Sequence, residues 1–216
     1  MKRILLFISV IHLFVTLDAQ VRFSISANPQ LNWFSSDLVQ IVPSGAGAGI
    51  STGLDIDYFF APNYAFTTGF NINWCGAKLT YTQTAGFPGG NDTLFTPAGA
   101  IMTHRMQFVT IPIGLKLKSE ELGYTTFYFH GGFTPMIRLN AFTSSYDETV
   151  VKEYVKESFR GFNLGYFIAG GIEYRLAGNT ALRAGLRWSS TLTDLTAFDD
   201  ANIKLNGMAL DIGILF

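Results

Sequence analysis

The last ten residues read GMALDIGILF, from Gly207 to Phe216, and their side chains alternate in kind. The even positions are large and apolar: Met208, Leu210, Ile212, Ile214 and Phe216. Up to Gly213 the odd positions carry only glycine, alanine and one carboxylate, Asp211. A period of two places these sets on opposite faces of a β-strand. The segment therefore predicts a strand with one large apolar face and one small, polar face.

The same alternation recurs in seven other segments. They are residues 21–33, 46–60, 65–81, 104–118, 125–140, 160–176 and 182–188. Most are longer than the roughly 5–6 residues of a common soluble strand. A tilted strand that crosses a bilayer needs roughly 9–11 residues. In a membrane barrel the large residues face lipid and the small or polar ones face the lumen. A soluble lipocalin-like barrel is the alternative, but its interior has little room for so many rings.

Short and long connections alternate between these segments. The short ones are 61–64, 119–124 and 177–180, and the long polar ones are 34–45, 82–103, 141–159 and 190–203. Short periplasmic turns and longer outer loops are typical of outer-membrane barrels. The sequence thus predicts an all-β fold: an eight-stranded antiparallel up-and-down transmembrane β-barrel in the outer membrane of a Gram-negative bacterium. We expect both chain ends in the periplasm.

Composition agrees with a membrane barrel and excludes several other classes. Charged residues are 14% of the chain, against about 25% in soluble domains. The 15 basic and 16 acidic residues give a net charge of −1, so the chain lacks the basic surplus that nucleic-acid binding usually needs. The single cysteine, Cys75, excludes an internal disulfide and a cysteine-based zinc cluster.

The first residues have the pattern of a cleaved signal peptide. Lys2 and Arg3 precede a mostly apolar run at 4–15, and Leu17-Asp18-Ala19 precedes Gln20. Such a run is too short to span a bilayer. We therefore expect a signal peptide at 1–19 and an outer-membrane β-barrel domain at 20–216. A buried N-terminal helix is the alternative, and Leu17 is larger than the small residue usual at its position.

The predicted lumen face carries many charges. It holds Arg22, Asp55, Asp57, Lys116, Lys118, Arg138, Glu173, Arg175, Arg183, Arg187 and Asp211. Eight strands enclose little more than side chains, and unpaired buried charges are costly.

These charges predict a lumen closed by ion pairs. The network is expected to comprise Asp55, Asp57, Arg138, Glu173, Arg175, Arg183, Arg187 and Asp211. Pairing about the 177–180 turn is expected to place residue 175 near 183 and residue 173 near 185, so that Glu173 and Asp211 neutralise Arg183 and Arg187. A polar conduit or a proton relay stays open as an alternative.

No catalytic, cofactor or metal site is expected. The histidines outside the signal peptide are His104 and His130, and neither belongs to a recognisable triad. The chain has no Gly-x-Ser-x-Gly, phosphate-binding glycine loop or His-x-x-x-His pair. Residues 146–159, within an outer loop, have a spacing that could form a short surface helix. That loop is either solvated or a contact surface for a partner protein.

Three segments resemble the PorT-like outer-membrane β-barrel proteins of Bacteroidota. They are Phe108–Lys116 (FVTIPIGLK), Gly165–Arg175 (GYFIAGGIEYR) and Leu182–Trp188 (LRAGLRW). The Ala19-Gln20 junction also suits that group. The resemblance implies an outer-membrane location. Some members serve type IX secretion and gliding, while most have no assigned activity.

The C-terminus resembles the sorting signal read by the barrel assembly machinery. Phe216 is the final residue, and Ile214 and Ile212 alternate before it, although Asp211 stands where a glycine is often found. An ordinary last strand is the alternative reading.

Three functions follow as hypotheses. The first is a non-catalytic barrel with a structural or interaction role through its surface loops. The second is an accessory component of a type IX secretion or gliding machinery, and the third is a lipid-modifying barrel enzyme. The expected partners are outer-membrane lipid, the barrel assembly machinery and secretion-machinery proteins.

Overall fold

The computed structural model describes residues 20–88, 93–145, 153–155, 158–197 and 202–216. The signal peptide expected at 1–19 lies outside the described residues. No helix among those residues is long and apolar enough to cross a membrane.

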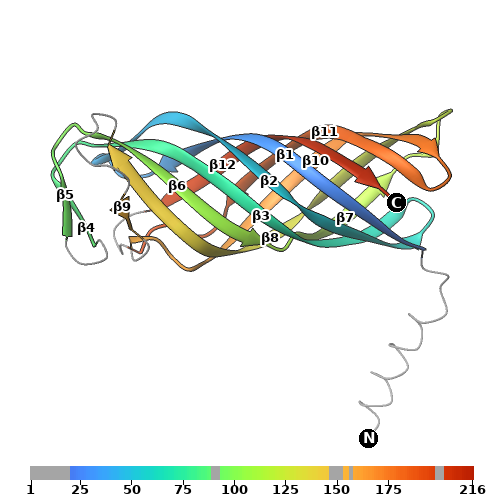
Figure 1. Ribbon diagram of the computed structural model, residues 1–216, viewed down its shortest axis with the longest axis horizontal. Coiled ribbons are helices and arrows are strands. Elements are labelled where there is room, and N and C mark those ends of the chain that lie inside the picture. The colour runs from blue at the N-terminus through green and yellow to red at the C-terminus, as the bar shows by residue number, and fades with distance from the viewer. Residues whose placement is uncertain (1–19, 89–92, 146–152, 156–157, 198–201) are drawn as a thin grey trace, which may run out of the picture.

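One closed antiparallel sheet forms the body of the molecule (Figure 1). Its strands are β1 (Gln20–Ser36), β2 (Ile41–Ala61), β3 (Tyr64–Tyr81), β6 (Ile101–Thr110), β7 (Ile113–Lys118), β8 (Thr125–Ser145), β10 (Phe162–Ala177), β11 (Thr180–Thr191) and β12 (Ile203–Leu215). Sheet order follows chain order, β12 pairs with β1, and β8 pairs with β10, so the ring closes. Because β6 and β7 share the neighbours β3 and β8, they form one interrupted strand. The eight-stranded barrel predicted from the sequence is confirmed.

The interruption between β6 and β7 falls at Ile111 and Pro112. Proline has no backbone N–H and cannot donate to the sheet ladder. The backbone N–H of Ile111 still donates to the carbonyl oxygen of Pro135 on β8, at 3.0 Å. The two halves therefore stay in one wall of the barrel.

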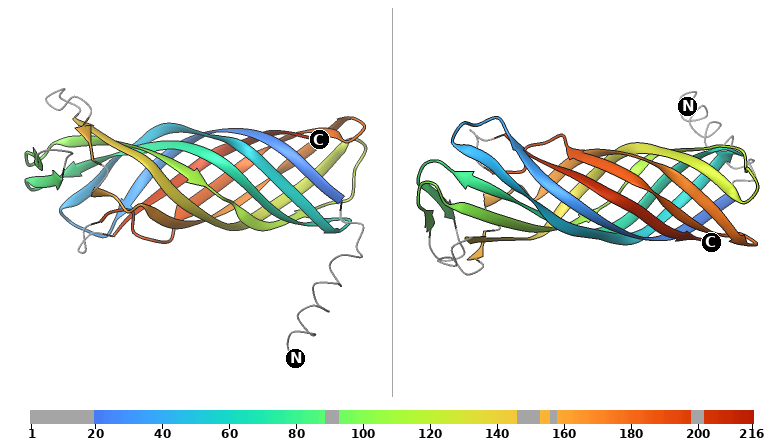
Figure 2. Two further views of the ribbon diagram at one scale, coloured as in Figure 1. Left: turned by 60° about the horizontal axis from the view of Figure 1, so that its bottom comes forward. Right: turned by 90° about the horizontal axis from the view of Figure 1, so that it is seen from above.

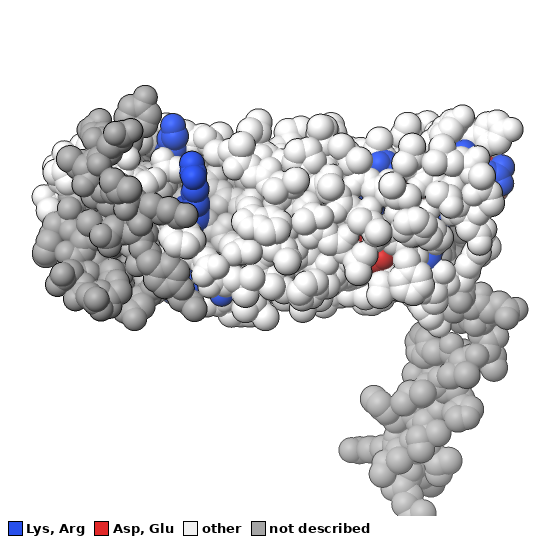
Figure 3. Space-filling model, viewed as in Figure 1, with Lys and Arg blue, Asp and Glu red and all other residues white. Residues whose placement is uncertain are grey.

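The alternating faces lie as the sequence predicts. Large apolar side chains such as Leu186 and Phe133 point outward, and Leu186 is 52% exposed. Asp211 and Glu173 point inward, and Asp211 is 0% exposed. Figure 3 shows a broad uncharged band on the outer surface between the charged residues near the two ends. This is the surface that a barrel presents to hydrocarbon.

The three short turns lie together at one end of the barrel, here called the turn end. Pro62-Asn63 and Gly178-Asn179 join their strands directly, and residues 119–124 make the third connection. Gly178 has a φ of 56°, which glycine adopts without the strain that a side chain would add. Gln20 and Phe216 also lie at this end (Figure 2).

The opposite end, here called the loop end, is more ordered than the sequence suggested. Only residues 37–40 separate β1 from β2, so the long connection expected at 34–45 is wrong. The strands continue there because their backbones remain paired up to Asn32 and Gly47, with β2 paired to β3 beyond that point. A separate hairpin, β4 (Ala85–Pro88) and β5 (Thr93–Thr96), projects past the rim (Figures 1 and 2).

The helix suggested for 146–159 is not what the described part of that segment forms. Glu153–Tyr154 make a short strand, β9, which pairs with Phe142 and Thr143 at the end of β8. Strand pairing with β8 satisfies that backbone instead of a helical turn. Residues 146–152 and 156–157 lie outside the described part of the chain.

Candidate functional site

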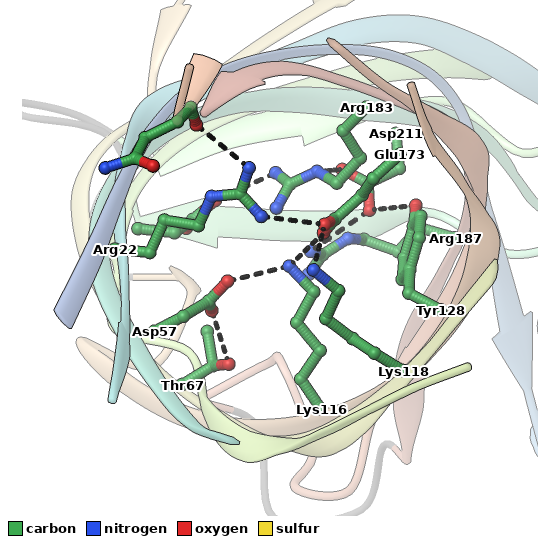
Figure 4. Close-up of polar contacts among 12 residues, drawn as sticks. Arg22, Asp57, Thr67, Lys116, Lys118, Tyr128, Glu173, Arg183, Arg187 and Asp211 are labelled. Carbon is green, nitrogen blue, oxygen red and sulfur yellow. Dashed lines mark hydrogen bonds and ion pairs between the residues drawn. The ribbon is translucent and has the colours of Figure 1, made fainter. Parts of the chain in front are cut away.

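A layer of charged side chains crosses the lumen near the turn end (Figure 4). It is called the charge layer here, and it consists of Arg22, Asp55, Asp57, Lys116, Lys118, Glu173, Arg183, Arg187 and Asp211. Six strands contribute: β1, β2, β7, β10, β11 and β12. Each residue stands at an inward position of its strand's alternation, which brings distant parts of the chain together.

Glu173 is the centre of the first half of the charge layer. Its carboxylate accepts a hydrogen bond from Arg22 Nη1 at 3.2 Å and forms ion pairs with Lys116 Nζ at 2.5 Å and Lys118 Nζ at 2.8 Å. Lys116 also donates to Asp57 at 2.7 Å, and Asp57 accepts from the hydroxyl of Thr67 at 2.7 Å. One continuous chain of polar contacts therefore links β1, β2, β3, β7 and β10.

Asp211 and Arg183 are the centre of the second half. Arg183 Nε lies 3.2 Å from Asp211, and its Nη2 lies 3.0 Å from Asp55. Asp211 also accepts from the Tyr128 hydroxyl at 2.8 Å and lies 3.9 Å from Arg187 Nη2. Arg187 in turn stacks its guanidinium over an aromatic ring of β10, Phe167, at 4.5 Å. These contacts hold both acids and both arginines in fixed positions.

The charge layer is close to neutral. Five bases against four acids leave a formal surplus of one positive charge (5 − 4 = 1), and seven ion pairs join them. The four acid side chains are at most 4% exposed. Removing one partner from such a network leaves a buried charge without its counter-charge, which is far costlier than losing a surface pair. The layer is therefore a mutually dependent set.

Amide side chains fill the next level of the lumen. Gln30 Nε2 donates to Asn73 Oδ1 at 2.6 Å. Together with Asn28, Asn32 and Asn71 these residues help to line a cavity of about 70 Å³. A polar cavity of this size has room for several ordered waters. This level offers no wide passage through the barrel.

The lumen at the loop end is lined mainly by apolar side chains. A cluster called the apolar plug comprises Phe34, Cys75, Ala77, Leu79, Tyr81, Met102, Met106, Phe108, Met136, Ala141, Val155, Phe159, Leu195, Ile203 and Leu205. His104 lies among its rings, with Nε2 3.0 Å from the Tyr81 hydroxyl and its centroid 5.5 Å from that of Phe159. The plug closes the lumen a second time by packing instead of charge.

Six of the residues predicted for the lumen network lie in the charge layer: Asp55, Asp57, Glu173, Arg183, Arg187 and Asp211. Arg175 does not. Its side chain is 50% exposed at the turn end and pairs with Glu121 at 2.8 Å, because β10 has reached the rim there. Arg138 lies on β8 in register with Phe108 of the apolar plug.

The predicted partner of Glu173 is also corrected. Pairing across the Gly178-Asn179 turn sets residue 173 opposite 183 and residue 175 opposite 181, two residues from the expected register. Arg187 instead faces Ala169, too far along the strand for Glu173. Arg183 turns to Asp55 and Asp211, while Glu173 takes the cations of β1 and β7.

Two features were missed by sequence reasoning. Tyr128 donates its hydroxyl hydrogen to Asp211; the alternation of β8 places Tyr128 on the lumen face, but that pattern does not indicate its partner. The apolar plug did leave a signal. In β3 the inward positions Cys75, Ala77, Leu79 and Tyr81 are apolar, so the alternation loses its polar half near the loop end.

The histidines occupy packed positions. The buried ring of His130 meets Phe167 edge-on at a centroid distance of 4.6 Å. His104 lies within the apolar plug, as described above. Among the described residues, no group of three or more His, Cys, Asp and Glu side chains is placed to hold a metal ion. Ile212, Ile214 and Phe216 point outward at the end of the chain, and their recognition as a sorting signal stays a prediction.

A closed antiparallel sheet that is apolar outside and charged inside defines a membrane-spanning β-barrel. Residues 15–197 match the family model of the outer membrane protein beta-barrel domain, and the chain belongs to that family. It is an integral protein of the outer membrane.

Three solved structures are similar to this chain at low sequence identity. The Escherichia coli outer membrane protease OmpT is 10% identical, with 93% of this chain and 97% of that one covered and a TM-score of 0.49. Neisserial surface protein A is 12% identical, with 89% and 95% covered and a TM-score of 0.47. The attachment invasion locus protein Ail of Yersinia pestis is 16% identical, with 91% and 99% covered and a TM-score of 0.42. No curated protein sequence matches the chain significantly.

Proposed function

We propose that this protein is a non-catalytic outer-membrane barrel with a closed lumen, which acts through its loop end at the cell surface. The charge layer is the observation that supports a closed lumen. Its seven ion pairs join six strands across the interior, and the apolar plug closes the lumen again further along. We place the turn end in the periplasm, as short turns and long outer loops favour.

The construction of the loop end supports an interaction role there. Val155, Phe159 and Leu195 come from connections between strands and are buried in the apolar plug. The backbone N–H of Arg160 donates to the carbonyl of Leu195 at 2.9 Å, which ties two of these connections together. Connections whose side chains are packed in the apolar plug can present a preformed surface. Binding to such a surface loses less conformational entropy, because fewer residues must be ordered.

Single-channel recording in planar bilayers tests the closed lumen. The purified full chain, inserted into the bilayer, is expected to show no steady conductance. A porin inserted under the same conditions supplies the positive control, and insertion is verified by protease protection of the barrel. A steady large conductance would overturn the proposal and revive the conduit hypothesis.

The finer assignment is a PorT-like protein of Bacteroidota, which the three segments at 108–116, 165–175 and 182–188 support. An accessory role in type IX secretion or gliding predicts stable partners. A pull-down from detergent-solubilised outer membrane measures this, and recovery of secretion proteins would favour that role over a free-standing barrel. A changed lipid mass spectrum after deletion of the gene would instead favour a lipid-modifying enzyme.

A further inference from the structure

Charges on the outer wall of the barrel are unevenly placed. In the eight wall strands the four acidic residues, Asp55, Asp57, Glu173 and Asp211, all point into the lumen. Three basic residues stand at outward positions instead, and all three lie toward the loop end: Lys78, Arg105 and Lys204. Figure 3 shows basic residues beyond the uncharged band at that end of the molecule. The outer wall is therefore positive where it leaves the apolar belt.

Two of these cations are neighbours across one strand pair. In the β3–β6 ladder Arg105 stands opposite Gly76, and Lys78 stands opposite Thr103, so the two basic residues are diagonal neighbours. Diagonal neighbours on one sheet face are roughly 7–8 Å apart, which long side chains can bridge. One tetrahedral oxyanion between them can contact both side chains.

Glycines in the adjacent strands make room for both side chains. A Cβ at Gly76 would lie 3.3 Å from Cγ of Arg105, so the arginine stem lies over bare backbone. A Cβ at Gly45 on β2 would lie 3.2 Å from Cδ of Lys78. The two stems therefore lie along the wall, that of Lys78 over β2 and that of Arg105 over β3, and Arg105 is exposed.

The height of this pair along the barrel matches lipid headgroups. Trp74 is an exposed residue of β3 and stands opposite Gln107 of β6. Gln107 is the next outward-facing residue after Arg105 along β6, in the direction of the apolar belt. Tryptophan is enriched where hydrocarbon meets headgroups. Cations just beyond it therefore lie at the level of headgroup phosphates.

We propose that Lys78 and Arg105 form a binding site for a phosphate of an outer-leaflet glycolipid of the lipid A type. Guanidinium and ammonium groups make strong charge-assisted hydrogen bonds to phosphate. A lipid-borne phosphate is favoured over a soluble anion because the site adjoins the apolar belt, where the acyl chains pack. The inference rests on the proposed orientation, which puts the loop end in the outer leaflet.

Native mass spectrometry of the full chain in mild detergent tests the site. The probes are diphosphoryl lipid A and the same lipid after enzymatic removal of its phosphates. The unmodified protein is expected to retain the phosphorylated form. Lys78→Gln and Arg105→Gln should each lower the retained fraction about fivefold, since a cation near a lipid surface contributes about 1 kcal/mol. Arg105→Lys should restore most of the binding.

Lys204→Gln is the matched control. It removes one outward positive charge toward the same end, but β12 is separated from β3 by β1 and β2. Binding should be unchanged in this variant. Equal loss in Lys204→Gln, equal retention of dephosphorylated lipid, or full displacement by millimolar inorganic phosphate would each overturn the site.

The outcomes of the lipid test and the conductance test are independent of each other. A barrel that stays closed but does not discriminate lipid phosphates refutes only the lipid site. A conducting barrel that retains phosphorylated lipid refutes only the closed lumen.

Discussion

Glu173 is the residue on which most ion pairs in its half of the charge layer depend. Its carboxylate is the shared counter-charge of Arg22, Lys116 and Lys118. Glu173→Gln would leave three cations with Asp57 as the only acid of that half. We expect a loss of roughly 3–5 kcal/mol in the free energy of unfolding, because a broken buried ion pair leaves uncompensated charge. Urea unfolding in lipid vesicles, followed by tryptophan fluorescence, measures this loss.

Arg175→Gln provides the comparison, two residues along the same strand. Arg175 pairs with Glu121, but both side chains are partly exposed at the rim. Exposed ion pairs contribute about 0–1 kcal/mol. A cost of Glu173→Gln no larger than that of Arg175→Gln would contradict the assignment of a dry, interdependent charge layer.

At the scale of the strand, the lipid-facing side of β11 is open to a direct test. Leu186 lies in the middle of that strand, is 52% exposed and points to lipid. Leu186→Arg should cost roughly 2–4 kcal/mol, since charge at mid-membrane is expensive. Leu176→Arg, at the turn end of β10, should cost only about 0–1 kcal/mol near the interface. Folding yield and urea midpoints in vesicles separate the two, and equal costs would refute the depth assignment.

Strand patterns also mark the limit of prediction from sequence. Alternation alone places Leu186 outside and Asp211 inside, because facing depends only on parity. It does not fix which lumen residues meet. Lys116 on β7 and Glu173 on β10 are separated by β8, so their contact depends on the stagger and tilt of the whole ring. Even the β10–β11 register differs by two residues from the one the sequence predicts, because it depends on how the Gly178-Asn179 turn closes.

The closed ring should make the whole molecule resistant to unfolding in detergent. A barrel without a free edge has no strand from which unpairing can begin cheaply. The protein should therefore stay folded in dodecyl sulfate without heating and migrate differently from the boiled sample on a gel. Identical mobility of the two samples would count heavily against a closed membrane barrel.

The contacts around Glu173 also have a mechanical consequence. They act as struts that join β1, β7 and β10 across the interior, while Asp57 adds β2 through Lys116. A thin tube is ordinarily soft against flattening, but cross-struts of fixed length resist it. Lateral pressure from the bilayer should therefore leave the turn end round. Any change in the shape of the cross-section should be confined to the opposite half, where the side chains of the apolar plug pack mainly by van der Waals contact.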